Sequence, residues 1–252
     1  MPNKTFELFI GIDQTGAVAG NGQPKSLPVC AIYRRKTIIN KTLPRLSLQE
    51  IQKFVLENFN LDIQSVKTLI CIDSVMTLPA PLKLTHRQIL QKIKKYSFEK
   101  KSYGAICAFH FFNSLNDKPQ IQSRYIEKKL GANSVFKLKP FQKNIGCGSY
   151  RILKELSLDP DWYQLWPVEK NKKQITICEG YPSYYWKSMY HLPQRNLLKI
   201  QKMTDLQFKN QDFADSFVLA KAAQKFGPQM QSMRLPQISK IEGWVLGAEY
   251  DL

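Results

Sequence analysis

Residues 66–73 (VKTLICID) form a nearly continuous apolar run, and residues 174–179 (QITICE) repeat this pattern later in the chain. Such runs are typical of strands that are buried on both faces of a sheet. The two segments therefore favour an α/β fold in which helices cover the faces of a mixed sheet. No linker rich in Gly, Ser or Pro divides the sequence. We expect a single domain over residues 1–252, with an insertion.

The remaining pattern predicts three more strands and several helices. Residues 6–13 alternate apolar side chains with others, which indicates a strand. Ser47, followed by Glu50 three residues later, forms a capping box that predicts the start of a helix. Further strands are expected at 28–34 and 36–42, and further helices at 85–101, 149–156 and 211–226.

Three of the predicted strands end in an acidic residue, namely Asp13, Asp73 and Glu179. In open α/β sheets, ligands bind at the carboxyl ends of the strands. An acid directly after an apolar run is costly unless a positive group pairs with it. Each acid alone could cap a turn or meet a lysine. Three acids at equivalent strand ends favour a shared site.

Two more acids, Asp212 and Asp215, open the predicted helix 211–226. Three residues apart, they lie about 60° from each other around the helix axis. The same face continues through the apolar residues Leu219 and Ala222, so it is expected to pack on the sheet. Acids in a first helical turn also interact favourably with the helix dipole, which is the alternative explanation.

Clustered carboxylates cannot all stay ionised in a dry site without cations. Hard divalent ions such as Mg²⁺ or Mn²⁺ prefer oxygen ligands. Two such ions about 4 Å apart can stabilise the attacking and leaving oxygens of a phosphodiester displacement. The five acids therefore predict a metal-dependent site for phosphodiester hydrolysis.

The charge balance indicates a polyanionic partner. The chain has 37 basic and 20 acidic residues, a net charge of +17 and an isoelectric point near 9.6. Basic runs of this kind can follow a phosphate backbone, although a solvated helix face is the usual alternative. We expect nucleic acid, either DNA or RNA, to contact Arg87, Lys94, Lys101, Lys143, Arg151 and Lys187.

The five cysteines are scattered and form no CxxC pair, which is typical of a reducing compartment. The N-terminal apolar run is short and ends in an acid, unlike a signal peptide. The most apolar later stretch, residues 104–112, is about half the length needed to cross a bilayer. A cytoplasmic protein without a membrane partner is expected.

Several short motifs resemble known families. The segments GIDQTGA and CIDSVMTLP, each a strand ending in Asp, and the helix DFADSFVLAKAA resemble the ribonuclease H-like superfamily. With EGYPS and the terminal IEGWVLG, the chain more narrowly resembles a predicted nuclease family, domain of unknown function family 429. These motifs occur in the expected order and cover most of the sequence.

The resemblance implies a five-stranded mixed sheet of order 3-2-1-4-5, with helices on both faces. It also implies an insertion over residues 80–145, which is helical and basic. As a nuclease, the protein would use Asp13, Asp73, Asp212 and Asp215 as metal ligands. Glu179, in the EGYP-like motif, would be a ligand or a base that orients water.

Two other functions stay open on the sequence. GIDQTGA also resembles the first phosphate loop of actin-like ATPases and sugar kinases, so a single-domain small-molecule kinase is one alternative. No second phosphate loop follows residue 100. A nucleic-acid-binding protein that keeps the fold without catalysis is the other. The basic charge supports it as well as it supports a nuclease.

Overall fold

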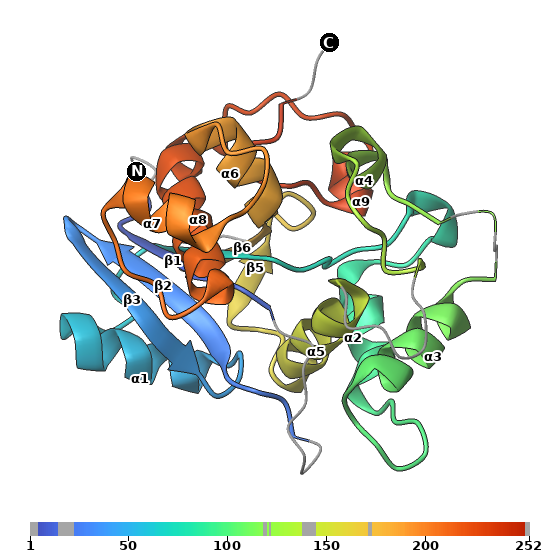
Figure 1. Ribbon diagram of the computed structural model, residues 1–252. Helices are drawn as coiled ribbons and strands as arrows, with labels where there is room; N and C mark the ends of the chain where they lie inside the picture. Colours follow the sequence, from blue (N-terminus) through green and yellow to red (C-terminus); the bar gives the residue numbers. More distant parts are fainter. Residues whose placement is uncertain are drawn as a thin grey trace.

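A single mixed sheet organises the molecule (Figure 1). The computed structural model describes residues 5–14, 23–117, 120, 122–137, 145–170 and 173–249. Within these ranges six strands lie in the order β3-β2-β1-β4-β6-β5. β1 is antiparallel to β2 and parallel to β4, and β4, β6 and β5 run parallel to one another. The strands are β1 (Leu8–Ile12), β2 (Leu27–Tyr33), β3 (Lys36–Leu43), β4 (Thr68–Ile72), β5 (Tyr163–Leu165) and β6 (Ile175–Glu179).

All five predicted strands are present and follow the predicted order, but the sheet has six strands rather than five. The additional strand, β5, is an edge strand of three residues. A segment this short carries no detectable alternation of apolar and polar residues, so the sequence pattern could not show it.

Helices cover both faces of the sheet. α6 (Pro182–Tyr190), α7 (Leu197–Thr204) and α8 (Gln211–Phe226) lie together over one face in Figure 1. Apolar residues of these three helices form one cluster with the β-strand side chains of that face. The opposite cluster contains residues of α1 (Leu48–Phe59), α2 (His86–Lys94), α3 (Ala105–Leu115) and α5 (Ile145–Leu158). The short helices are α4 (Tyr125–Leu130), α9 (Ser239–Glu242) and two 3₁₀ turns at Ala80–Leu82 and Gly227–Gln229.

Two of the predicted helices occur at the positions that the sequence pattern predicts. Ser47 caps α1 by accepting a hydrogen bond from the Glu50 backbone N–H, and α8 has the predicted bounds. The predicted helix at 149–156 lies inside the longer α5. The helix predicted at 85–101 is wrong beyond Lys94, where α2 ends.

The early end of α2 has a local cause. Tyr96 packs on Phe111 with ring centroids 5.1 Å apart, and Phe98 stacks on His110 at 3.8 Å. These aromatic contacts hold the chain against α3 in a turn, whose Phe98 forms a bridge with Lys101. Arg87, Lys94 and Lys101 are seven residues apart in the sequence, which predicts one shared helix face. Because α2 ends at Lys94, Lys101 does not share that face.

The described part of the predicted insertion, residues 80–145, packs on the main body of the protein. α2 and α3 both contact α5, and their apolar side chains belong to the same core cluster as one face of the sheet. Among the described residues, none of the helices has the length and apolar character needed to cross a bilayer.

Gly11 sets the distance between the sheet and α8. A Cβ atom at this position would lie 2.1 Å from the Ser216 carbonyl oxygen and 2.3 Å from the Ala220 nitrogen. The backbone of β1 therefore lies directly against the backbone of α8, with no room for any side chain. Gly11 stands two residues before Asp13, and Ser216 directly follows Asp215, so this contact positions the acids of both elements.

Replacing Gly11 by alanine should therefore destabilise the protein by about 3 kcal/mol, because the new methyl group forces β1 and α8 apart. Urea denaturation measures the loss. The control is Gly104→Ala, where nothing lies within 4 Å but φ is +108°. This control should lose about 1 kcal/mol through backbone strain. Equal stability of Gly11→Ala and the wild type would contradict the direct backbone contact.

Candidate active site

Asp13 and Asp73 lie side by side at the ends of two neighbouring parallel strands. Ile12 of β1 is in register with Ile72 of β4, and each aspartate is the next residue. The Asp73 backbone N–H donates to the Ile12 carbonyl oxygen at 3.1 Å, so the ladder continues to this point. Adjacent strands are about 4.8 Å apart. The fold thus brings these two predicted site residues together.

Asp215 reaches the same place from α8. Asp215 is 2% exposed. Oδ1 accepts hydrogen bonds from Trp186 Nε1 at 2.7 Å and Gln211 Nε2 at 3.0 Å, and Oδ2 accepts one from Arg195. Asp215 is therefore held firmly, with both oxygens already in use. Asp212, one turn earlier on α8, is exposed and lines the adjoining cleft.

The aspartates are close enough to shift one another's pKa values. Burial raises the pKa of Asp13 well above its ordinary value, and the charges of Asp73, Asp215 and Asp212 raise it further. Burial and the charge of Asp215 raise the pKa of Asp73 to about 7. Arg195 opposes both shifts. Without a further cation, the Asp13–Asp73 pair does not hold two full negative charges near neutral pH.

Glu179 belongs to a separate cluster on the opposite face of the sheet. It is in register with Ile72, one residue before the level of Asp73. Because side chains alternate along a strand, Glu179 points away from the aspartates. Arg124 Nη1 donates to both carboxylate oxygens at 2.8 and 2.7 Å, and the Met76 N–H donates to one of them at 2.8 Å. We therefore leave Glu179 out of the candidate metal ligands.

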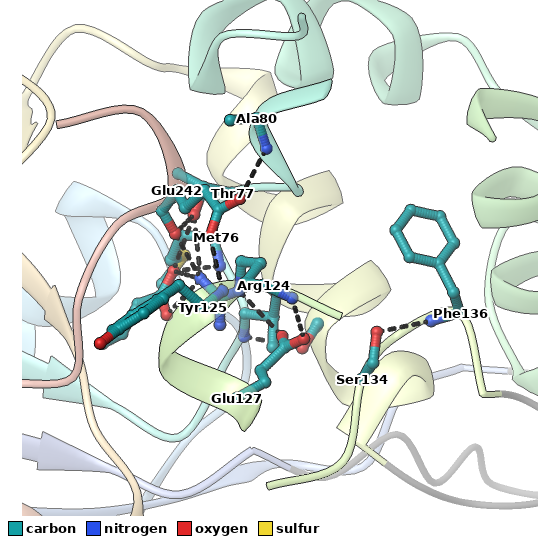
Figure 2. Close-up of polar contacts among 12 residues, drawn as sticks. Met76, Thr77, Ala80, Arg124, Tyr125, Glu127, Ser134, Phe136 and Glu242 are labelled. Atoms are coloured by element: carbon teal, nitrogen blue, oxygen red, sulfur yellow. Dashed lines mark hydrogen bonds and ion pairs between the residues drawn. The ribbon is translucent and has the colours of Figure 1, made fainter. Parts of the chain in front are cut away.

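Figure 2 shows Arg124 at the centre of this second network. Its Nε also pairs with Glu127 at 2.8 Å, and its Nη1 donates to the Glu242 carbonyl oxygen at 2.9 Å. The Glu242 carboxylate accepts from the Ala80 and Tyr125 backbone N–H groups. One buried guanidinium thus ties the start of α4 to the end of β6, which gives this network a structural role.

A cleft with a volume of about 440 Å³ lies between the two clusters. Asp73 and Ser74 line it together with Asp212 and Arg195, while α4 contributes apolar residues. Among the described residues, two buried oxygen atoms at this cleft have no hydrogen-bond partner, Gln14 Oε1 and Ser74 Oγ. Each belongs to the residue that follows one of the paired aspartates.

The site offers only two carboxylates to a Mg²⁺-like ion. Within the described part of the chain, no three Asp, Glu, His or Cys side chains are grouped so that they could hold a metal ion. The four-aspartate ligand set expected from the sequence is therefore not assembled. Mg²⁺ is commonly held by only one or two carboxylates, completed by water and substrate phosphates. Asp13 and Asp73, at the ends of adjacent strands, match that pattern.

Two of the basic residues predicted to contact nucleic acid are engaged within the fold. Arg87 forms an ion pair with Glu169, with Nε and Oε1 2.6 Å apart. Arg151 is buried and pairs with Glu155 at 2.8 Å. A guanidinium in a buried ion pair is not available to a phosphate backbone, so Arg151 does not have the role predicted for it.

The other predicted contact residues that the structure describes are exposed to solvent. Lys94, Lys101 and Lys187 are exposed. Lys143 lies outside the described residues, as do residues 15–17 of the GIDQTGA motif on which the kinase alternative depends. Lys94 belongs to α2, Lys101 to the turn after it and Lys187 to α6, so these exposed lysines occupy separate positions in the fold.

Sequence reasoning missed the two arginines that partner the acids. Arg195 lies between α6 and α7, and Arg124 stands just before α4. The rule that a buried acid requires a positive partner does call for such residues. It does not select two of the 37 basic residues, because neither arginine belongs to a periodic pattern.

The chain matches no protein-family model, and no curated protein and no solved structure matches it. The resemblance to the ribonuclease H-like superfamily, and to domain of unknown function family 429, therefore stays a prediction.

The raised pKa of Asp73 predicts that the stability of the protein depends on pH. The folded value is about 7, and the unfolded value is about 3.9. Between these pH values the folded state keeps a proton that the unfolded state has lost. The free energy of unfolding in EDTA should therefore fall as the pH rises from about 4 to about 7. Asp73→Asn removes this effect and should raise stability at pH 8 by about 2 kcal/mol.

Chemical denaturation of the wild type and of Asp73→Asn at pH 4 and pH 8 tests this expectation. The difference between the two proteins should be large at pH 8 and small at pH 4. Asp159→Asn, at an exposed position outside the cleft, is the matched control and should change stability little at either pH. A loss of stability for Asp73→Asn at pH 8 would contradict the unfavourable burial of this carboxyl group.

Proposed function

We propose that the protein is a metal-dependent nuclease that hydrolyses phosphodiester bonds of nucleic acid. The reaction centre is the Asp13–Asp73 pair, with Asp215 and Arg195 beside it. The observation that carries the proposal is the pairing of two carboxyl groups at the ends of adjacent parallel strands, where the surrounding protein raises the pKa of both. This arrangement is unfavourable for an empty site and favourable for one that takes a divalent cation.

Asp13 and Asp73 would hold Mg²⁺ or Mn²⁺, and the unpartnered Ser74 hydroxyl lines the adjoining cleft. When bound, such an ion supplies Lewis-acid stabilisation of the charge that develops on the phosphate. Because the pKa of Asp73 is about 7, the pair gives up a proton when a cation binds near neutral pH. Metal affinity should therefore increase with pH through this range.

Asp215 acts through Arg195. Its carboxylate is fixed by Trp186 and Gln211, and it orients the Arg195 guanidinium at the cleft. The Arg195 side chain is 42% exposed. A guanidinium placed in this way can bind two oxygens of a phosphodiester while its charge offsets that of the aspartates. This pairing supports a phosphate-containing substrate.

The charge of the chain supports a polyanionic substrate. A net charge of +17 attracts nucleic acid over distances of about one Debye length, and exposed residues such as Lys94, Lys101 and Lys187 can bind phosphates. A neutral or cationic small substrate would gain nothing from this field. The same field makes binding depend steeply on salt.

A cleavage assay tests the function on labelled single-stranded, duplex and branched DNA and RNA. We expect cleavage in Mg²⁺ or Mn²⁺ and none in EDTA. Asp73→Asn should lower the rate at least about 100-fold, because one of the two carboxylates is lost, while salt-dependent binding is retained. Asp159→Asn should cleave like the wild type.

Two outcomes would overturn the proposal. Undiminished cleavage by Asp73→Asn would remove the site from the mechanism. Wild-type protein that binds every substrate and cleaves none would favour the non-catalytic alternative, and ATP turnover under these conditions would favour the kinase.

A further inference from the structure

Helix α6 begins at the cleft without a side-chain cap. Its N-cap residue is Tyr181, and no side chain caps the first turn among the described residues. Pro182 has no N–H group, so the first donors are the backbone N–H groups of Ser183 and Tyr184. Tyr181, Pro182 and Ser183 line the cleft. The positive end of the helix dipole therefore faces this space.

Ser74 provides an independent observation at the same cleft. Ser74 is 2% exposed, lines the cleft, and has a hydroxyl group with no hydrogen-bond partner among the described residues. Ser74 and α6 follow neighbouring parallel strands. The Gly180 N–H donates to the Ile72 carbonyl oxygen at 2.8 Å, which ties the turn before α6 to the end of β4. A buried hydroxyl without a partner points to a ligand that completes it.

Arg195 adds a full positive charge to the same cleft. Its guanidinium is held by Asp215, and its side chain remains partly exposed. The cleft thus collects three kinds of donor: helical N–H groups, a hydroxyl and a guanidinium. The carboxyl pair that would bind a cation lies at the ends of the adjacent strands β1 and β4.

We propose that the N-terminus of α6, Ser74 and Arg195 form a phosphate-binding subsite in this cleft. The inference rests on the proposed function, since it assigns the place of a substrate phosphate beside the Asp13–Asp73 pair. Helix N-termini bind phosphate through free N–H groups and the helix dipole, and arginine binds it with two donors. A phosphate supplies acceptor oxygens for all three kinds of donor, and the hydroxyl of Ser74 donates to one of them.

The volume of the cleft also limits the ligand. About 440 Å³ is within the range of pockets that take small molecules. A single phosphate with its attached nucleoside fits such a space. We therefore expect the subsite to take the phosphate of one nucleotide.

A metal-free titration tests the subsite separately from cleavage. Inorganic phosphate is added in EDTA to ¹⁵N-labelled protein, and the amide resonances of Ser74, Ser183 and Tyr184 are followed by NMR. We expect saturable shifts at these residues. Ser183→Asp places a negative charge in the first turn of α6, where it favours the helix but repels phosphate. It should weaken binding at least tenfold, and Ser74→Ala should weaken it severalfold.

The matched control is Leu198→Asp, which places the same charge at the second position of α7, where Leu198 is 75% exposed. This control should bind phosphate like the wild type. Absence of saturable shifts, or equal weakening by Ser183→Asp and Leu198→Asp, would overturn the subsite.

Two further probes, a nucleoside monophosphate and the matching nucleoside, distinguish a nucleotide ligand from free phosphate. Tighter binding of the monophosphate than of inorganic phosphate, with no binding of the nucleoside alone, supports a nucleotide ligand. Equal binding of the monophosphate and of inorganic phosphate would overturn the nucleotide assignment. Because no metal is present, phosphate binding without cleavage would refute the nuclease alone, and cleavage without phosphate binding would refute the subsite alone.

Discussion

Two carboxyl groups lie next to each other because β1 and β4 run parallel and in register, so that Asp13 and Asp73 follow paired isoleucines. α8 adds a third, since Gly11 lets its backbone lie against β1 and brings Asp215 to the same place. Like charges at this spacing raise each other's pKa and lower the stability of the folded protein near neutral pH. Arg195 offsets part of that repulsion. The remainder is what a divalent cation would relieve.

The position of each acid relative to the sheet decides its role. Asp13 and Asp73 lie on the α8 face. Glu179 is in register with Ile72, one residue before Asp73, and therefore points to the other face. There it meets Arg124, which joins α4 to β6. One side of the cleft between the clusters therefore carries the aspartates, whose pKa values are raised by burial and like charge. On the other side, Arg124 and Glu179 are paired with each other and hold the described part of the insertion against the sheet.

The sequence predicted the central strands because buried strands leave continuous apolar runs, and it predicted α1 and α8 because Ser47 and the acid-headed apolar stripe mark their starts. It also located the strand-end acids. It did not reveal the face on which Glu179 lies, because a shift of one residue in register reverses every side chain. Arg124 and Arg195 belong to segments that show no periodic pattern of apolar residues. The turn after Lys94 depends on aromatic contacts with α3. These features are set by tertiary packing.

The most direct measurement is anomalous diffraction from crystals soaked in Mn²⁺ near pH 7.5. We expect a Mn²⁺ peak about 2 Å from a carboxylate oxygen of Asp13 and of Asp73, on the α8 face, with the Arg124–Glu179 pair intact. Crystals in which no Mn²⁺ binds to these two residues, and in which their carboxyl groups share a proton instead, would contradict the central claim that this pair is a cation site.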